Sequence, residues 1–79
     1  MITKTEKDLI RLLKACGLDK ETTVSVSILL ETDENRQRMI DIIIARYHQT
    51  GEVTEQFIQK AGLYLTGDLK PEYKDRFSR

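Results

Sequence analysis

Apolar residues recur with helical spacing in the first part of the chain. The spacing i, i+3, i+4, i+7 of one helix face is followed by Leu9, Leu12, Leu13 and Cys16. Thr3, with Glu6 three residues later, forms the capping-box pattern that marks a helix start. Gly17 follows where a left-handed cap is expected, and Leu18 can fold back onto the last turn. The pattern predicts a helix over residues 4–16.

The second segment carries two conflicting signals. Residues 24–28 alternate between apolar side chains and serine, a period of two that is typical of a strand. Asp19, however, is placed to cap a helix. A strand here would have no partner elsewhere in the chain, and its backbone groups would stay unpaired. We therefore favour a short, buried helix over residues 20–31, with a strand as the alternative.

Two further helices follow, each with a threonine at its start. Thr32 is placed to cap a third helix that reaches Gln49 and stops at Gly51. Thr54 is placed to cap a fourth that ends near Gly67. The expected inward residues of the third helix are Met39, Ile40, Ile43, Ile44 and Tyr47, and those of the fourth are Phe57, Ile58, Ala61, Tyr64 and Leu65.

The connections between these four helices are about three residues long, which forces consecutive helices to pack against each other. The expected fold is all-α: a compact bundle of four short helices with short connections and a polar C-terminal tail. Residues 1–67 form the helical domain, and residues 68–79 form the tail. Pro71 within the tail either opens a short extra helix or interrupts a disordered segment.

Composition excludes several classes of protein. The formal net charge is zero over 79 residues, so nothing global favours nucleic acid or an anionic membrane. The single cysteine forms no internal disulfide, and charged residues stand near the N-terminus where a signal peptide needs an apolar run. The longest apolar run, residues 42–45, is too short to span a membrane. We expect a cytoplasmic domain with no membrane contact.

Candidate catalytic chemistry is sparse. His48 is the only histidine, and about 10.5 Å of helix separates it from Asp41 on the same side, too far for an orienting hydrogen bond. Cys16 lies on an apolar face, where an inert core thiol is expected. One cysteine and one histidine do not make a zinc site, and the scattered glycines form no phosphate loop. We expect no enzyme activity, no cofactor and no small-molecule substrate.

Basic residues gather on one side of the first helix. Lys4, Lys7, Arg11 and Lys14 fall within an arc of about 80°, opposite the leucine face. The stripe is interpreted as a solvated face, with contact to an anion or to an acidic protein as alternatives.

Two segments raise the possibility of DNA binding. Leu13 with residues 16–18 resembles the turn of DNA-binding helix-turn-helix units, in which a glycine follows the first helix. The better candidate for a recognition helix is the start of the third helix, since Arg suits guanine while Asn and Gln suit adenine. The residues concerned are Asn35, Arg36, Gln37 and Arg38. A pI near 6.6 opposes this interpretation, because DNA-binding domains are usually basic.

The leading expectation is a helical protein-interaction module that binds a protein partner or a second copy as a homodimer. Ile42 stands about 160° from Ile40 and Ile44 on the third helix, so the fourth helix, the C-terminal tail or another molecule is expected to cover it. Cover by another molecule would give a contact with an apolar centre and a polar rim. The expected contact comprises Asn35, Arg38, Ile42, Arg46 and Gln49. The alternative is a small helix-turn-helix DNA-binding regulator that reads bases with residues 35–38 and contacts phosphates with the basic stripe.

Overall fold

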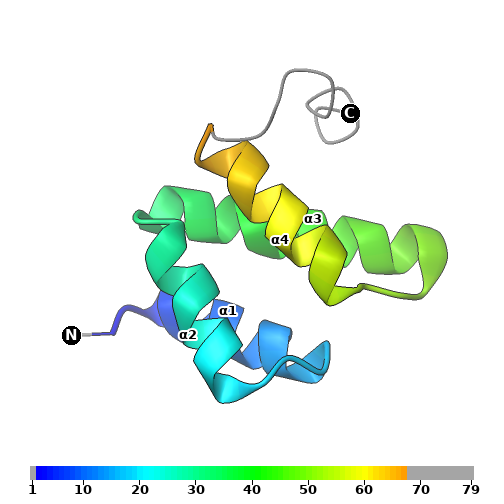
Figure 1. Ribbon diagram of the computed structural model, residues 1–79, viewed down its shortest axis with the longest axis horizontal. Coiled ribbons are helices and arrows are strands. Elements are labelled where there is room, and N and C mark those ends of the chain that lie inside the picture. Colours follow the sequence, from blue (N-terminus) through cyan, green and yellow to red (C-terminus); the bar gives the residue numbers. More distant parts are fainter. Residues whose placement is uncertain (1, 68–79) are drawn as a thin grey trace.

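Four α-helices make up the fold in the computed structural model, which describes residues 2–67 (Figure 1). In chain order they are α1 (Lys4–Ala15), α2 (Lys20–Leu29), α3 (Asp33–Thr50) and α4 (Glu55–Leu65). The predicted all-α bundle of four short helices is confirmed. The prediction for the tail, residues 68–79, lies outside the described residues.

Each helix begins at a capping side chain that the sequence supplies. The side-chain oxygen of Thr3 accepts a hydrogen bond from the Glu6 N–H at 3.1 Å. The same arrangement opens the other three helices at Asp19, Thr32 and Thr54. A side-chain acceptor at this position satisfies one of the four backbone N–H groups that a helix start leaves unpaired. Local chemistry therefore sets where every helix starts.

The end of α1 has the geometry that its sequence predicts. Gly17 adopts a φ of 95°, the left-handed region in which glycine carries no steric cost. The Leu18 N–H donates to the Leu13 carbonyl at 3.2 Å, and the Leu18 side chain is buried. This hydrogen bond and the hydrophobic contact that accompanies it are the features of a Schellman motif. The motif reverses the chain so that α2 packs against α1.

The ambiguous second segment is helical, and residues 2–67 contain no strand. Its buried side includes small polar residues, because Thr23 and Ser27 lie inward together with Val26. The Thr23 hydroxyl donates to the Lys20 carbonyl at 2.7 Å, so this buried hydroxyl has a hydrogen-bond partner within its own helix. The alternation at residues 24–28 therefore reflects a helix that is only weakly amphipathic.

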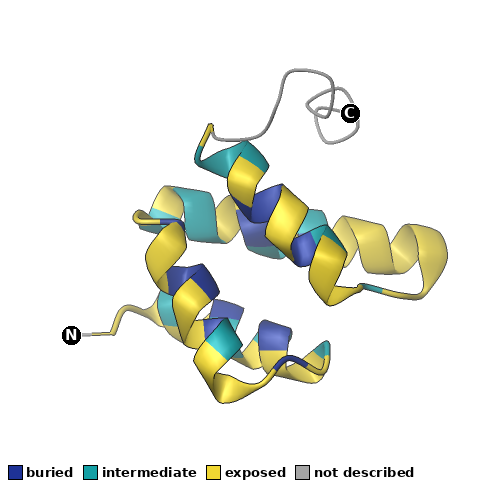
Figure 2. Ribbon diagram, viewed as in Figure 1, coloured by how far each residue is buried: buried dark blue, intermediate teal, exposed yellow. Residues whose placement is uncertain are grey.

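The core lies where all four helices meet. Helix α1 packs against α2 and α3, and α4 packs against the same two helices. Figure 2 shows the buried positions facing one another across the bundle, while the C-terminal end of α3 is exposed. The buried apolar residues are Leu9, Leu13, Leu18, Val26, Leu30, Met39, Ile43, Ile58 and Ala61.

Candidate functional site

The face centred on Ile42 is closed by contacts within the chain. Ile42 is half-buried and packs against the core, which agrees with the alternative that another part of the chain covers it. One turn further along α3, the Arg46 guanidinium lies 4.8 Å from the centroid of the Phe57 ring on α4. Because residues i and i+4 share a helix face, the side of α3 that carries Ile42 is the side that α4 covers.

The polar residues predicted to surround Ile42 are divided between the interior and the solvent. The Asn35 side-chain amide donates to the Leu30 carbonyl at 2.9 Å and joins α3 to the preceding turn. Arg38 is exposed and pairs with Glu34 one turn earlier. Gln49 is exposed near the end of α3. These residues therefore surround a covered isoleucine.

Arg36 points into the domain and joins three helices. Its side chain is only 11% exposed. The guanidinium Nε donates to the Ser27 carbonyl at 3.0 Å, and Nη1 donates to Asp33 at 2.9 Å. Nη1 also lies 3.7 Å from a carboxylate oxygen of Glu6 on α1, while the Thr3 hydroxyl donates to Asp33 at 3.0 Å. We call these five residues the Arg36 network.

The Arg36 network occupies a position where a cation is needed. The carbonyls of the last turn of α2 have no partner within that helix and carry partial negative charge. The Arg36 guanidinium satisfies the carbonyl of Ser27 there. Arg36 is therefore committed to the fold and does not project from the start of α3 as a base-reading side chain would.

The other residues of the predicted base-reading set also make contacts along the chain. Gln37 and Arg38 are exposed, and the Gln37 amide donates to Asp41 at 3.2 Å. On α1, the basic stripe of Lys4, Lys7, Arg11 and Lys14 is exposed throughout. The structure brings the stripe together as expected, but it turns Arg36 away from solvent and ties Asn35 to Leu30.

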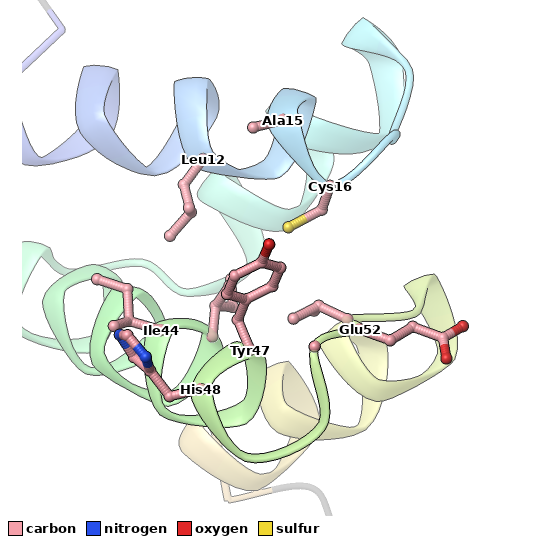
Figure 3. A pocket seen from close by; sticks show the side chains of 10 residues that line it. Leu12, Ala15, Cys16, Ile44, Tyr47, His48 and Glu52 are labelled. Carbon is pink, nitrogen blue, oxygen red and sulfur yellow. The ribbon is translucent and has the colours of Figure 1, made fainter.

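A hollow in the surface lies elsewhere, between α1 and the second half of α3 (Figure 3). This groove has a volume of about 620 Å³. Ile44 and Tyr47 lie along it, although both were expected in the core; their exposed fractions are 45% and 60%. We call it the α1–α3 groove, and it is lined by Leu12, Ala15, Cys16, Ile43, Ile44, Tyr47, His48, Gly51, Glu52 and Val53.

The groove exists because α3 is longer than the helices that cover it. Its 18 residues span about 27 Å, whereas the 12 residues of α1 span about 18 Å. Figure 1 shows the end of α3 extending beyond α1 and α2, and residues 44–50 are all exposed. The helix thus carries its apolar pattern past the point where α1 stops at Ala15.

The side chains of the groove suit packing better than catalysis. The Tyr47 ring reaches from α3 toward α1 and meets the His48 ring edge-on, with centroids 6.4 Å apart (Figure 3). Cys16 is half-buried rather than fully buried, and burial raises the pKa of its thiol. A raised pKa keeps the thiol protonated at neutral pH, when it is a weak nucleophile. Within residues 2–67, no group of three or more His, Cys, Asp or Glu residues is placed to hold a metal ion.

A second apolar surface lies over α2 and α4. A smaller hollow of about 240 Å³ is lined there by Val26, Leu29, Ile58, Gln59, Gly62 and Leu63. Ile28, which is 68% exposed, stands on the same helix as two of these residues. Both surfaces contain isoleucine, which allows matched substitutions to compare them.

Comparison with known proteins gives no further assignment: no family model, curated protein or solved structure matches this chain. Across the described part of the chain, no helix combines the length and the apolar character needed to cross a membrane.

Proposed function

We propose that this domain is a helical protein-interaction module whose docking surface is the α1–α3 groove. The observation that carries the proposal is the exposure of two large apolar side chains, Ile44 and Tyr47, along the same groove at the C-terminal end of α3. Grouped apolar residues on the surface of a small domain are characteristic of protein contacts. Tyrosine is enriched among the residues that dominate binding energy, because its ring supplies a large rigid contact and its hydroxyl a polar one.

The surroundings of Tyr47 fit the anatomy of such a contact. His48 and Glu52 line the groove beside its apolar floor. A central apolar area with polar groups at its edge excludes water from the centre and fixes the orientation of the partner. A DNA-binding role draws less support, because Asn35 and Arg36 are occupied by hydrogen bonds within the domain.

The test is site-specific crosslinking in the host cells. Tyr47 is replaced by p-benzoylphenylalanine, an aromatic residue that forms adducts on illumination. We expect an adduct of discrete mass that disappears when Ile44→Asp is added, since a charge buried in an apolar contact opposes binding. The matched control is Ile28→Asp, which changes the same residue type on α2 and should leave the adduct intact.

Binding measurements with the purified partner then give the loss of affinity that the substitution causes. Ile44→Asp should weaken its binding at least about tenfold, which corresponds to about 1.4 kcal/mol. Circular dichroism must show unchanged helicity, as expected for a residue that lies outside the core. Absence of any discrete adduct, or an adduct that Ile44→Asp leaves unchanged, would refute the proposal.

A further inference from the structure

We infer that the occupant of the α1–α3 groove is a second copy of this chain, with its α3 antiparallel to the first. The inference rests on the proposed function and adds the identity and the orientation of the partner. Its basis is the order of the carboxylate and imidazole side chains along the exposed face of α3. Ile44 lies on that face between Asp41 and His48, and all three side chains are exposed.

These three residues share one side of the helix. At 100° per residue, Asp41, Ile44 and His48 fall within an arc of about 60°. Along the axis, Asp41 precedes Ile44 by about 4.5 Å and His48 follows it by about 6 Å. The face therefore carries an acid on one side of its apolar centre and an imidazole at nearly the same distance on the other.

That order complements itself only when the second helix runs in the opposite direction. A twofold axis near Ile44 places Asp41 of each copy beside His48 of the other, so that the contact occurs twice. An imidazole N–H can then donate to a carboxylate on both sides of the apolar centre. A parallel pair would instead place Asp41 against Asp41, which is unfavourable.

The rest of the structure permits this arrangement. The end of α3 extends past α1 (Figure 1), and residues 44–50 are all exposed, so this part of the helix is accessible to the α3 of a second copy. Tyr47 lies next to this face and lines the groove of its own copy, so the proposed contact includes both Tyr47 and the groove. The net charge of zero means that two copies do not repel each other overall.

The experiment exchanges the carboxylate at position 41 and the imidazole at position 48. His48→Asp places acids opposite each other in the antiparallel pair, and Asp41→His places imidazoles opposite each other. The double variant Asp41→His/His48→Asp restores both contacts with their direction reversed. The two positions are about 10.5 Å apart within one helix, too far to contact each other inside one copy. Recovery in the double variant therefore reports contacts between copies.

Sedimentation equilibrium at several protein concentrations gives the dissociation constant, and circular dichroism checks the fold of each variant. We expect a dimer for the wild type and for Ile28→Asp, and a monomer for Ile44→Asp. Each single charge variant should weaken the dimer about tenfold, and the double variant should return to within about threefold of wild type.

Three results would overturn the inference. A wild-type protein that stays monomeric at every concentration excludes a second copy, and an Ile44-dependent crosslink from Tyr47 to a different protein would then leave the proposed function standing. A dimer that Ile28→Asp dissociates and Ile44→Asp does not would place the contact on α2. A dimer that needs Ile44 but does not recover in the double variant would exclude the antiparallel pairing.

Discussion

Replacement of Arg36 by methionine should destabilise the domain far more than the same replacement two residues later. Methionine keeps the length and the helix propensity of arginine while removing its charge and hydrogen bonds. At position 36 the change leaves the Ser27 carbonyl without its donor and leaves Asp33 without its cation. Arg38 is the matched control, since it also pairs with an acid along α3 but both side chains are exposed.

The magnitudes follow from burial. A hydrogen bond to a charged group contributes about 1.5–3 kcal/mol, and a buried acceptor left unpaired costs about 1–3 kcal/mol. Asp33 is 44% exposed, so its ion pair adds little. We therefore expect Arg36→Met to lower the free energy of unfolding by about 2–3 kcal/mol. An exposed pair one turn apart contributes about 0.3–0.5 kcal/mol, which is the loss expected for Arg38→Met.

Urea unfolding followed by circular dichroism at one fixed protein concentration measures both losses. Arg36→Lys provides a milder variant should the methionine variant fail to fold, because an ammonium keeps the charge but not the planar fork of donors. Its free energy of unfolding should lie between those of wild type and Arg36→Met. Equal losses at positions 36 and 38 would refute the argument that the Arg36 network stabilises the junction of the three helices.

Four further predictions concern individual positions. Gly62→Ala should raise the free energy of unfolding by about 0.5–1 kcal/mol in urea melts, because the position is helical and a Cβ there would meet its nearest atoms at 3.7 Å; a loss would contradict this. Gly51→Ala, at a φ of 73°, should instead lower it by about 1 kcal/mol. Side-chain and backbone hydrogen bonds from Thr22 lower the pKa of Asp19, so the stability that its charge contributes is fully present above the ordinary value of 3.8 and is lost as the pH falls through the lowered pKa. The advantage of wild type over Asp19→Asn, measured by urea melts along an acid titration, should shrink in that range, and an advantage that persists in strong acid would exclude this cause. Ile42→Ala should lower the free energy of unfolding in urea by about 1–2 kcal/mol, because the residue packs against the core. The mass of the protein in solution should stay unchanged, and a changed mass would show that Ile42 belongs to a contact between molecules.

The helices were predictable because their boundaries depend on short-range chemistry. A cap needs one side-chain oxygen and one N–H three residues later, and the sequence shows such a residue before each helix. The second helix was the hardest to assign, because its alternation favoured a strand until the lack of a partner was considered. The cap at Asp19 is correct, and the strand signal at residues 24–28 had no structural consequence.

Which side of α3 faces solvent was not predictable in the same way. Apolar residues occur on both sides of this helix, and periodicity alone does not say which neighbour covers each side. The side of α3 that carries Ile42 and Arg46 faces α4, whereas α1 stops at Ala15, and Ile44 and Tyr47 are exposed. The difference in length between α1 and α3 decides which side chains of α3 are exposed. This difference can be used only when the packing of the two helices is known.

The burial of Arg36 was not predictable for a related reason. A charged residue at the start of a helix usually faces solvent, and its place beside the inward face was the only sequence signal against that assumption. Its burial depends on the short turn between α2 and α3, which brings the Ser27 carbonyl within hydrogen-bond distance of a side chain in the first turn of α3. The base-reading interpretation of residues 35–38 assumed that the Arg36 side chain is free to contact a ligand. In the structure this side chain instead forms hydrogen bonds within the domain.

The two ends of α3 consequently have different roles. The Arg36 network fixes the first end to α1 and α2, and the second end extends into solvent with Ile44 exposed. An exposed apolar helix end requires an anchor that does not depend on it, because otherwise the helix would unwind whenever the groove is empty. Arg36 and Ile44 are separated by about 12 Å of helix, beyond the distance at which substitutions usually couple. Arg36→Met should therefore lower the stability of the folded monomer equally in wild type and in Ile44→Asp, while only the change at Ile44 weakens association. A coupling energy above about 0.5 kcal/mol between the two substitutions in the monomer would show that both ends of α3 depend on each other.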